Sequence, residues 1–176
     1  YLNDASRVQL MPGAAEGISL LNHFGVRIFV ASNQSGVARG IITHEQLAAV
    51  NTRIRELLAA QGAQVGKIYV CTHGDEDNCD CRKPKSGLIR QIIAENGIDP
   101  LKTYIAGDRA RDLGCGREAG MRGILVGRSD EPMPANLVFC AADLREVASF
   151  VLEEIFERES REHVYADARA AGPLFD

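Results

Sequence analysis

The sequence lacks any apolar stretch that approaches the roughly 20 residues of a membrane-spanning helix. It also lacks an excess of positive charge, because 20 lysines and arginines stand against 24 aspartates and glutamates. The formal net charge of −4 argues against a general nucleic-acid binder, which is usually basic. No internal repeat and no linker is visible, and 176 residues suit one domain with its own core.

Cysteine is sparse outside one short segment. Three of the five cysteines, Cys71, Cys79 and Cys81, cluster there with His73. The pairs Cys-x-His and Cys-x-Cys, joined by a polar loop, suit a four-coordinate zinc ion, because residues two apart on an extended segment point the same way. Four protein ligands close such a site, so we expect a structural zinc; buried thiols beside a surface histidine are the alternative. The cluster favours metal binding over disulfide bonds, and it indicates a reducing cytoplasm.

Helical and strand patterns alternate along the chain. Short β-branched runs predict strands, and apolar residues at helical spacing predict helices. Strands are expected over 26–31, 67–70, 103–106, 123–126 and 137–139. Helices are expected over 14–24, 43–62, 88–95, 112–118 and from 143 onward. This alternation implies an α/β fold, with a parallel sheet covered by helices on both faces and with Cys115 and Cys140 in its core.

Polar residues follow three of the expected strands, at the sheet edge where ligands bind in open α/β folds. Ser32, Cys71 and Asp108 each lie just past a strand end. The turn over 32–36 offers a hydroxyl and free backbone N–H groups, which suit a phosphate; a plain polar turn is the alternative. Asp108 suits a hard cation such as Mg²⁺. Asp112 is better explained as a helix-terminal residue favoured by the helix dipole.

A cationic pair, Arg82-Lys83, comes directly after the metal-type cluster. Arginine offers a planar fork and lysine a point charge, and Pro84 stiffens the backbone that follows. A solvated charge pair is the ordinary interpretation of such a doublet. Its place against the metal loop favours an anion site.

These motifs together resemble those of the haloacid dehalogenase (HAD) superfamily phosphatases. The segments that carry the resemblance, in order, are Ser32-Asn33-Gln34-Ser35-Gly36-Val37-Ala38-Arg39-Gly40, the Cys-x-His and Cys-x-Cys pairs, Arg82-Lys83-Pro84 and Gly107-Asp108-Arg109. The resemblance covers about residues 1–127. It implies a Rossmannoid three-layer parallel sheet without a large cap domain, the zinc loop shaping the entrance instead. We expect the phosphatase domain over 1–156 and a helix end with a flexible tail over 157–176.

The resemblance also implies an activity. It points to a Mg²⁺-dependent phosphatase that hydrolyses a small sugar-phosphate monoester through a phosphoaspartyl intermediate. The implied substrate is D-glycero-D-manno-heptose 1,7-bisphosphate, cleaved to the 1-phosphate. Histidinol phosphate, a nucleic-acid 3′-phosphate and a non-catalytic zinc-bearing relative are the alternatives. The resemblance fits a cytoplasmic monomer that acts on a phosphorylated metabolite, with no nucleic acid and no membrane.

Residue roles follow from the same resemblance. Ser32 would hydrogen-bond the transferring phosphoryl group, Lys83 would balance its charge, and Asp108 would hold Mg²⁺. The implied zinc ligands are Cys71, His73, Cys79 and Cys81. The implied substrate contacts are Tyr1, Asn33, Gln34, Ser35, Arg82 and Arg109.

One family motif is absent from the sequence. The Asp-x-Asp pair at the end of the first strand supplies the nucleophile and the general acid, and Asp4 stands alone with no apolar strand ahead of it. In the family this motif would lie just upstream of Tyr1, and the sequence does not begin with Met. We therefore expect truncation rather than true loss, and a chain that is inactive as written. A missing central strand should leave an unpaired row of backbone groups.

Overall fold

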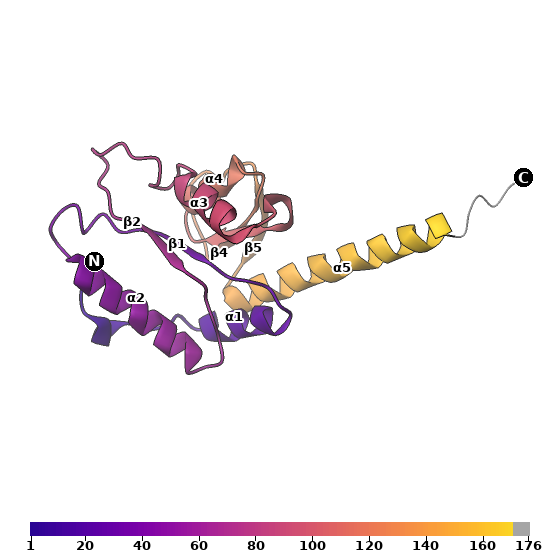
Figure 1. The fold of residues 1–176 in the computed structure, drawn as a ribbon, viewed down its shortest axis with the longest axis horizontal. Coiled ribbons are helices and arrows are strands. Elements are labelled where there is room, and N and C mark those ends of the chain that lie inside the picture. Colours follow the sequence, from indigo (N-terminus) through magenta and orange to yellow (C-terminus); the bar gives the residue numbers. More distant parts are fainter. Residues whose placement is uncertain (171–176) are drawn as a thin grey trace, which may run out of the picture.

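The computed structural model describes the backbone of residues 1–170 and the side chains of residues 1–161. Strands and helices alternate along this part of the chain (Figure 1). The strands are β1 (Val30–Asn33), β2 (Ile68–Cys71), β3 (Tyr104–Gly107), β4 (Arg122–Val126) and β5 (Leu137–Ala141). The α-helices are α1 (Ala14–His23), α2 (His44–Ala59), α3 (Gly87–Asn96), α4 (Ala110–Arg117) and α5 (Leu144–Ala170). Two short 3-10 helices, η1 (Ala5–Arg7) and η2 (Pro100–Lys102), complete the set.

The helix boundaries follow from local sequence signals. The hydroxyl of Thr43 accepts a hydrogen bond from the backbone N–H of Gln46, whose side chain accepts one from the N–H of Thr43. This capping box starts α2 where the sequence predicts it. Helix α3 ends at Gly97, which has a left-handed φ of 60°, also as predicted. Helix α2 ends earlier than expected, at Ala59, because the residues up to Gly62 form tighter turns.

All strand pairs are parallel, as predicted, but they form two sheets in place of one. Strand β1 pairs with β2, and β3, β4 and β5 pair in that order. Within the described residues, no strand lies between β1 and β3, so each of these strands keeps one unpaired edge. Ala106 of β3 is exposed, whereas Ile124 of β4 is fully buried. The unpaired edges expected from the absent Asp-x-Asp strand are therefore present.

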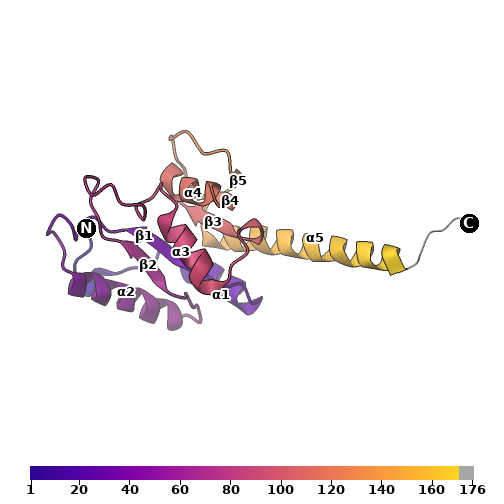
Figure 2. The same ribbon diagram turned by 45° about the horizontal axis from the view of Figure 1, so that its top comes forward.

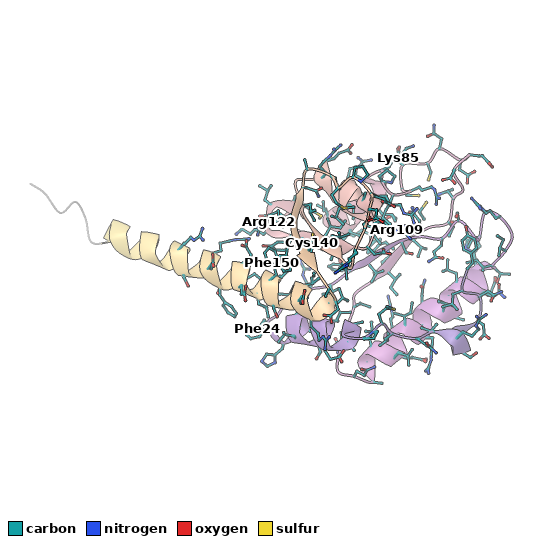
Figure 3. The ribbon with its side chains drawn as sticks, turned by 180° about the vertical axis from the view of Figure 1, so that it is seen from behind. Phe24, Lys85, Arg109, Arg122, Cys140 and Phe150 are labelled. Carbon is teal, nitrogen blue, oxygen red and sulfur yellow. The ribbon has the colours of Figure 1, made fainter. Side chains whose placement is uncertain are left out.

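Helices cover both faces of the strands, which gives the predicted three layers (Figures 1 and 2). Helices α1 and α5 pack on one face, where the core contains Leu21, Ile124 and Val151. Gly17 permits this contact, because a Cβ there would lie 2.2 Å from the carbonyl oxygen of Leu144. Figure 3 shows Phe150 of α5 on the same side of the molecule as Phe24, which follows α1. Helices α3 and α4 cover the other face.

The two cysteines outside the metal-type cluster differ from each other. Cys115 of α4 is fully buried, as predicted. Cys140 is exposed, so its predicted place in the core is wrong. Strand β5 is the edge of its sheet, and Val138 and Cys140 lie on its exposed face.

Helix α5 begins after Asp143, whose carboxylate accepts hydrogen bonds from the N–H groups of Arg145 and Glu146. Its last turns project away from the layers (Figures 1 and 2). The helix continues to Ala170, inside the 157–176 segment for which a helix end and a tail are predicted, and residues 171–176 lie outside the described part. None of the helices described is both long enough and apolar enough to span a membrane.

Candidate active site

A cavity of about 300 Å³ opens between the carboxyl ends of β1 and β3. Eight residues line it: Ser32, Asn33, Lys83, Ala106, Gly107, Asp108, Arg111 and Asp112. Four of them, Ser32, Asn33, Lys83 and Asp108, are residues that the sequence predicts for a site. The fold therefore brings together residues that are far apart in sequence, as expected from the rule that ligands bind beyond the carboxyl ends of parallel strands.

Lys83 reaches the cavity wall with its charge paired. Its Nζ donates a hydrogen bond of 2.7 Å to the carbonyl oxygen of Ala31 and lies 2.6 Å from Oδ1 of Asp112. The side chains of Lys83 and Asp112 are only 12% and 13% exposed. A carbonyl of β1 and a carboxylate of α4 thus hold one ammonium group between the two sheets.

Asp112 is a site residue that sequence reasoning missed. It does lie in the first turn of α4, as the helix-dipole interpretation expects. It also lines the cavity and pairs with Lys83, so a helix-terminal role alone is an incomplete description. Gly107 allows this approach, because a Cβ there would lie 2.4 Å from the Cβ of Asp112. Its position four residues after Asp108 was the available signal.

Asn33 fixes the main chain of Lys83. Its Nδ2 donates to the carbonyl oxygen of Lys83 at 3.1 Å, and its Oδ1 accepts from the N–H of Lys83 at 3.0 Å. Next to it, the Oγ of Ser32 accepts a 2.9 Å hydrogen bond from Nε2 of Gln34. Because that oxygen already accepts, the hydroxyl proton of Ser32 is free to be donated into the cavity.

The other five predicted substrate contacts lie outside the cavity lining: Tyr1, Gln34, Ser35, Arg82 and Arg109. The hydroxyl groups of Tyr1 and Ser35 are 3.0 Å apart, so Tyr1 lies against the turn that follows Ser32. The guanidinium of Arg109 is 56% exposed and faces Glu131 at 3.5 Å, on the surface seen in Figure 3. Arg111 lines the cavity instead. Helix α4 begins at Ala110, two residues before the predicted start, and this places Arg111 in its first turn.

Arg82 also lies outside the cavity lining. Its Nε donates a 2.6 Å hydrogen bond to Oδ1 of Asp75, a residue of the loop between the two cysteine-containing pairs. Arg39, from the segment after the Ser32 turn, approaches the same carboxylate at 3.6 Å. The loop therefore connects two cations from different parts of the chain.

The four predicted metal ligands converge. The sulfur and nitrogen atoms that Cys71, His73, Cys79 and Cys81 offer lie within 4.8 Å of one another, a set that could hold a metal ion. The sulfur of Cys81 is 3.0 Å from that of Cys71 and 3.4 Å from that of Cys79. Desolvation, then hydrogen bonds with Cys71 and Cys79, raise the pKa of the Cys81 thiol to about 12. A bound metal must therefore displace its proton.

Cys115 lies close to the cavity but is not a nucleophile. Its Sγ donates a 3.0 Å hydrogen bond to the carbonyl oxygen of Asp112. Burial raises the pKa of this thiol to about 11, so it stays protonated at neutral pH. Its part is to pack the interior beneath α4.

The chain is similar to known proteins of one family. The HAD-hydrolase-like family model matches residues 80–147, which include Lys83, Asp108 and Asp112. The D-glycero-beta-D-manno-heptose-1,7-bisphosphate 7-phosphatase of Pseudomonas aeruginosa is 40% identical over 81% of this chain and 83% of its own length. The enzyme of the same name from Pasteurella multocida is 30% identical over 88% of this chain and 84% of its own length.

A comparison of folds also finds a heptose-bisphosphate phosphatase. The crystal structure of D,D-heptose 1,7-bisphosphate phosphatase from Bordetella bronchiseptica, complexed with magnesium and phosphate, matches with a TM-score of 0.81. It is 30% identical in sequence, and the match covers 88% of this chain and 89% of that one. The chain therefore belongs to the HAD-like hydrolases. Within that class it is a phosphatase, a hydrolase of phosphoric monoesters.

Proposed function

We propose that this chain forms the body of a Mg²⁺-dependent phosphatase that removes the 7-phosphate of D-glycero-D-manno-heptose 1,7-bisphosphate. The observation that carries the proposal is the cavity at the ends of β1 and β3, where the hydroxyl of Ser32, the ammonium of Lys83 and the carboxylate of Asp108 meet. The likeness to heptose-bisphosphate phosphatases supports this choice of substrate over histidinol phosphate.

Ser32 and Lys83 bind the transferring phosphoryl group in this proposal. The free proton of the Ser32 hydroxyl donates to one phosphoryl oxygen, and the Lys83 ammonium balances the charge. Asn33 acts on the position of Lys83, because both of its hydrogen bonds to that residue are to the main chain.

Asp108 is the proposed Mg²⁺ ligand. Carboxylate oxygens suit this hard cation, and the side chain of Asp108 is 74% exposed at the cavity, so it is accessible to an ion. Asp112 offers a second carboxylate on the same wall, although Lys83 occupies one of its oxygens. A bound Mg²⁺ would neutralise part of the negative charge that gathers around the phosphate.

Zinc is the proposed ion of the cysteine–histidine cluster. A tetrahedron with Zn–S bonds of about 2.3 Å has edges of about 3.8 Å. The Sγ atoms of Cys71 and Cys79 lie 3.6 Å apart, and Nδ1 of His73 lies 3.7 Å from the Sγ of Cys71. Four protein ligands close the coordination, so this ion stiffens the loop that leads into Arg82 and Lys83.

The nucleophile and the general acid need a further segment. We propose that an apolar strand ending in Asp-x-Asp pairs with the free edges of β1 and β3 and faces Lys83. The first aspartate would attack phosphorus and form an aspartyl phosphate, while the second protonates the departing sugar oxygen. The second aspartate would then take a proton from water, whose oxygen attacks the aspartyl phosphate and releases inorganic phosphate.

The test compares two proteins in the presence of Mg²⁺. One is the 176-residue chain, and the other carries, ahead of Tyr1, an added apolar strand that ends in Asp-x-Asp. Phosphate release is measured from the heptose bisphosphate, from histidinol phosphate and from a 3′-phosphorylated oligonucleotide. We expect turnover by the extended chain alone, fastest on the heptose bisphosphate, and none after replacement of its first aspartate by asparagine.

Other results would change the proposal. Faster release from histidinol phosphate would assign the alternative substrate. No turnover of any of the three by the extended chain would contradict a phosphatase of this kind. Full turnover by the 176-residue chain would contradict the assignment of the nucleophile.

A further inference from the structure

Asp75 lies between two arginines beside the cavity. Nε of Arg82 is 2.6 Å from its Oδ1, and Nη2 of Arg39 is 3.6 Å from its Oδ2. The Asp75 side chain is 67% exposed and that of Arg39 is 54% exposed, whereas that of Arg82 is only 19% exposed. A nearly buried cation is thus covered by a carboxylate that water reaches freely.

Arg82 has more donor capacity than Asp75 uses. Its Nη1 is buried and has no hydrogen-bond partner among the described residues. A buried donor without an acceptor is costly, and a charged one more so. The contact with Asp75 therefore leaves Arg82 incompletely satisfied.

The three residues are connected through the main chain to residues that line the cavity. The turn after Ser32 is joined to the metal-type loop by hydrogen bonds from the N–H of Gln34 to the carbonyl of Cys71, at 2.7 Å, and from the N–H of Ala38 to the carbonyl of Thr72, at 3.2 Å. Arg39 directly follows one end of this junction. Arg82 directly precedes Lys83, which lines the cavity.

We propose that Asp75 occupies the arginine pair in place of the second anionic group of the substrate, and so lowers the affinity for substrates that carry two such groups. The inference rests on the proposed function, in which the substrate carries two phosphates. Two guanidinium groups and one carboxylate leave a net positive charge, so a second phosphate is attracted. Its oxygens can engage both arginines, and the exposed ion pair that it replaces is weak.

A substrate with a single phosphate gains nothing from this exchange. It has no group that can replace the Asp75 carboxylate, so the two arginines stay paired with that residue. Asp75 therefore weakens the binding of a ligand with two anionic groups, because such a ligand must first release a contact inside the protein. Removal of its charge should strengthen binding only of ligands with two anionic groups.

The test uses Asp75→Asn, which keeps the shape and removes the charge. Dissociation constants are measured by calorimetry on the full zinc-loaded chain, with heptose 1,7-bisphosphate and heptose 7-phosphate as the two ligands. We expect the variant to bind the bisphosphate about fivefold more tightly and the monophosphate unchanged. Glu76→Gln is the matched control, since it removes one charge from the neighbouring exposed position and should change neither constant.

Each other outcome contradicts the inference in a distinct way. Weaker or unchanged bisphosphate binding by Asp75→Asn, with normal binding by the unaltered chain, would overturn the role of Asp75 and leave the proposed function intact. Equal gains for both ligands would show a general charge effect and would also overturn it. If the unaltered chain binds neither sugar phosphate, the inference fails, and turnover by the chain extended with the Asp-x-Asp strand decides the proposed function separately.

Discussion

Nζ of Lys83 lies 2.6 Å from Oδ1 of Asp112, and the two side chains are almost fully buried. The pair connects the segment after the metal-type loop to the first turn of α4. It therefore joins the half of the molecule that contains β1 and β2 to the half that contains β3, across the position where the sheet is divided.

Removal of either Lys83 or Asp112 from the pair should lower the free energy of unfolding. In Lys83→Met, the carboxylate of Asp112 stays buried without its counter-charge, and the free energy of unfolding should fall by about 3 kcal/mol. Asp112→Asn should lower it by a similar amount. The double variant should lose clearly less than the sum of the two, as urea unfolding would measure. Strictly additive losses would show that the two groups do not stabilise each other.

The cysteine–histidine cluster should bind about one zinc ion per chain. Cys81→Ala removes one of the four ligands, so we expect loss of the ion and a lower unfolding temperature, because binding of a structural metal is coupled to folding. Metal analysis and thermal unfolding measure these two effects. Cys140→Ala is the control, since this exposed cysteine lies outside the cluster and should leave both unchanged. Protein purified without chelator that contains no zinc would contradict the proposal.

Asn33→Ala should weaken phosphate binding although Lys83 itself is not replaced. The substitution removes two hydrogen bonds to the main chain of Lys83, and we expect affinity for inorganic phosphate to fall about tenfold. Asn22→Ala is the matched control, because Asn22 also makes two hydrogen bonds to main-chain atoms, those of Val26 and Gln64. The control should lose stability and keep its phosphate affinity. Equal affinity losses in both variants would show an unspecific effect.

Glu95 should contribute to acid stability. Hydrogen bonds from Lys67, then from Gln91 and Tyr69, lower the pKa of this carboxyl from its ordinary 4.5 to about 2. A depressed carboxyl pKa stabilises the folded protein above pH 4.5, and this stabilisation is lost as the pH falls toward 2. Glu95→Gln should therefore be less stable than the unaltered protein at pH 7, and the difference in unfolding free energy should shrink across that interval. A difference in unfolding free energy between the two proteins that stays constant from pH 7 to pH 2 would contradict the role of Glu95 in acid stability.

Local signals in the sequence were sufficient for much of the fold. The capping box at Thr43 and the stop at Gly97 depend only on neighbouring residues, so both could be predicted. The strand-end rule predicted without knowledge of the strand order that Ser32 and Asp108 converge, and both line the cavity, whereas Cys71, the third residue that it named, does not. The paired spacing of the metal ligands was also sufficient to predict their convergence.

Features that depend on distant parts of the chain were not predictable in the same way. Arg111 enters the cavity because α4 starts earlier than its sequence pattern indicates. Cys140 lies on the exposed face of β5, and the sequence of β5 alone does not reveal which face the rest of the chain leaves uncovered. The contact of Asp75 with Arg39 and Arg82 depends on how two irregular loops lie against each other, and no periodic pattern describes that.

The metal-type loop begins at the Cys-x-His pair and ends at the Cys-x-Cys pair. The first pair adjoins β2, and the second adjoins the segment that leads to Lys83. Between His73 and Cys79 the chain makes no regular structure. Because closure of a longer loop adds little entropic cost, this stretch can change in length or sequence while the framework stays constant. Exchange of the residues between His73 and Cys79 would therefore alter the substrate preference and leave the surrounding fold unchanged.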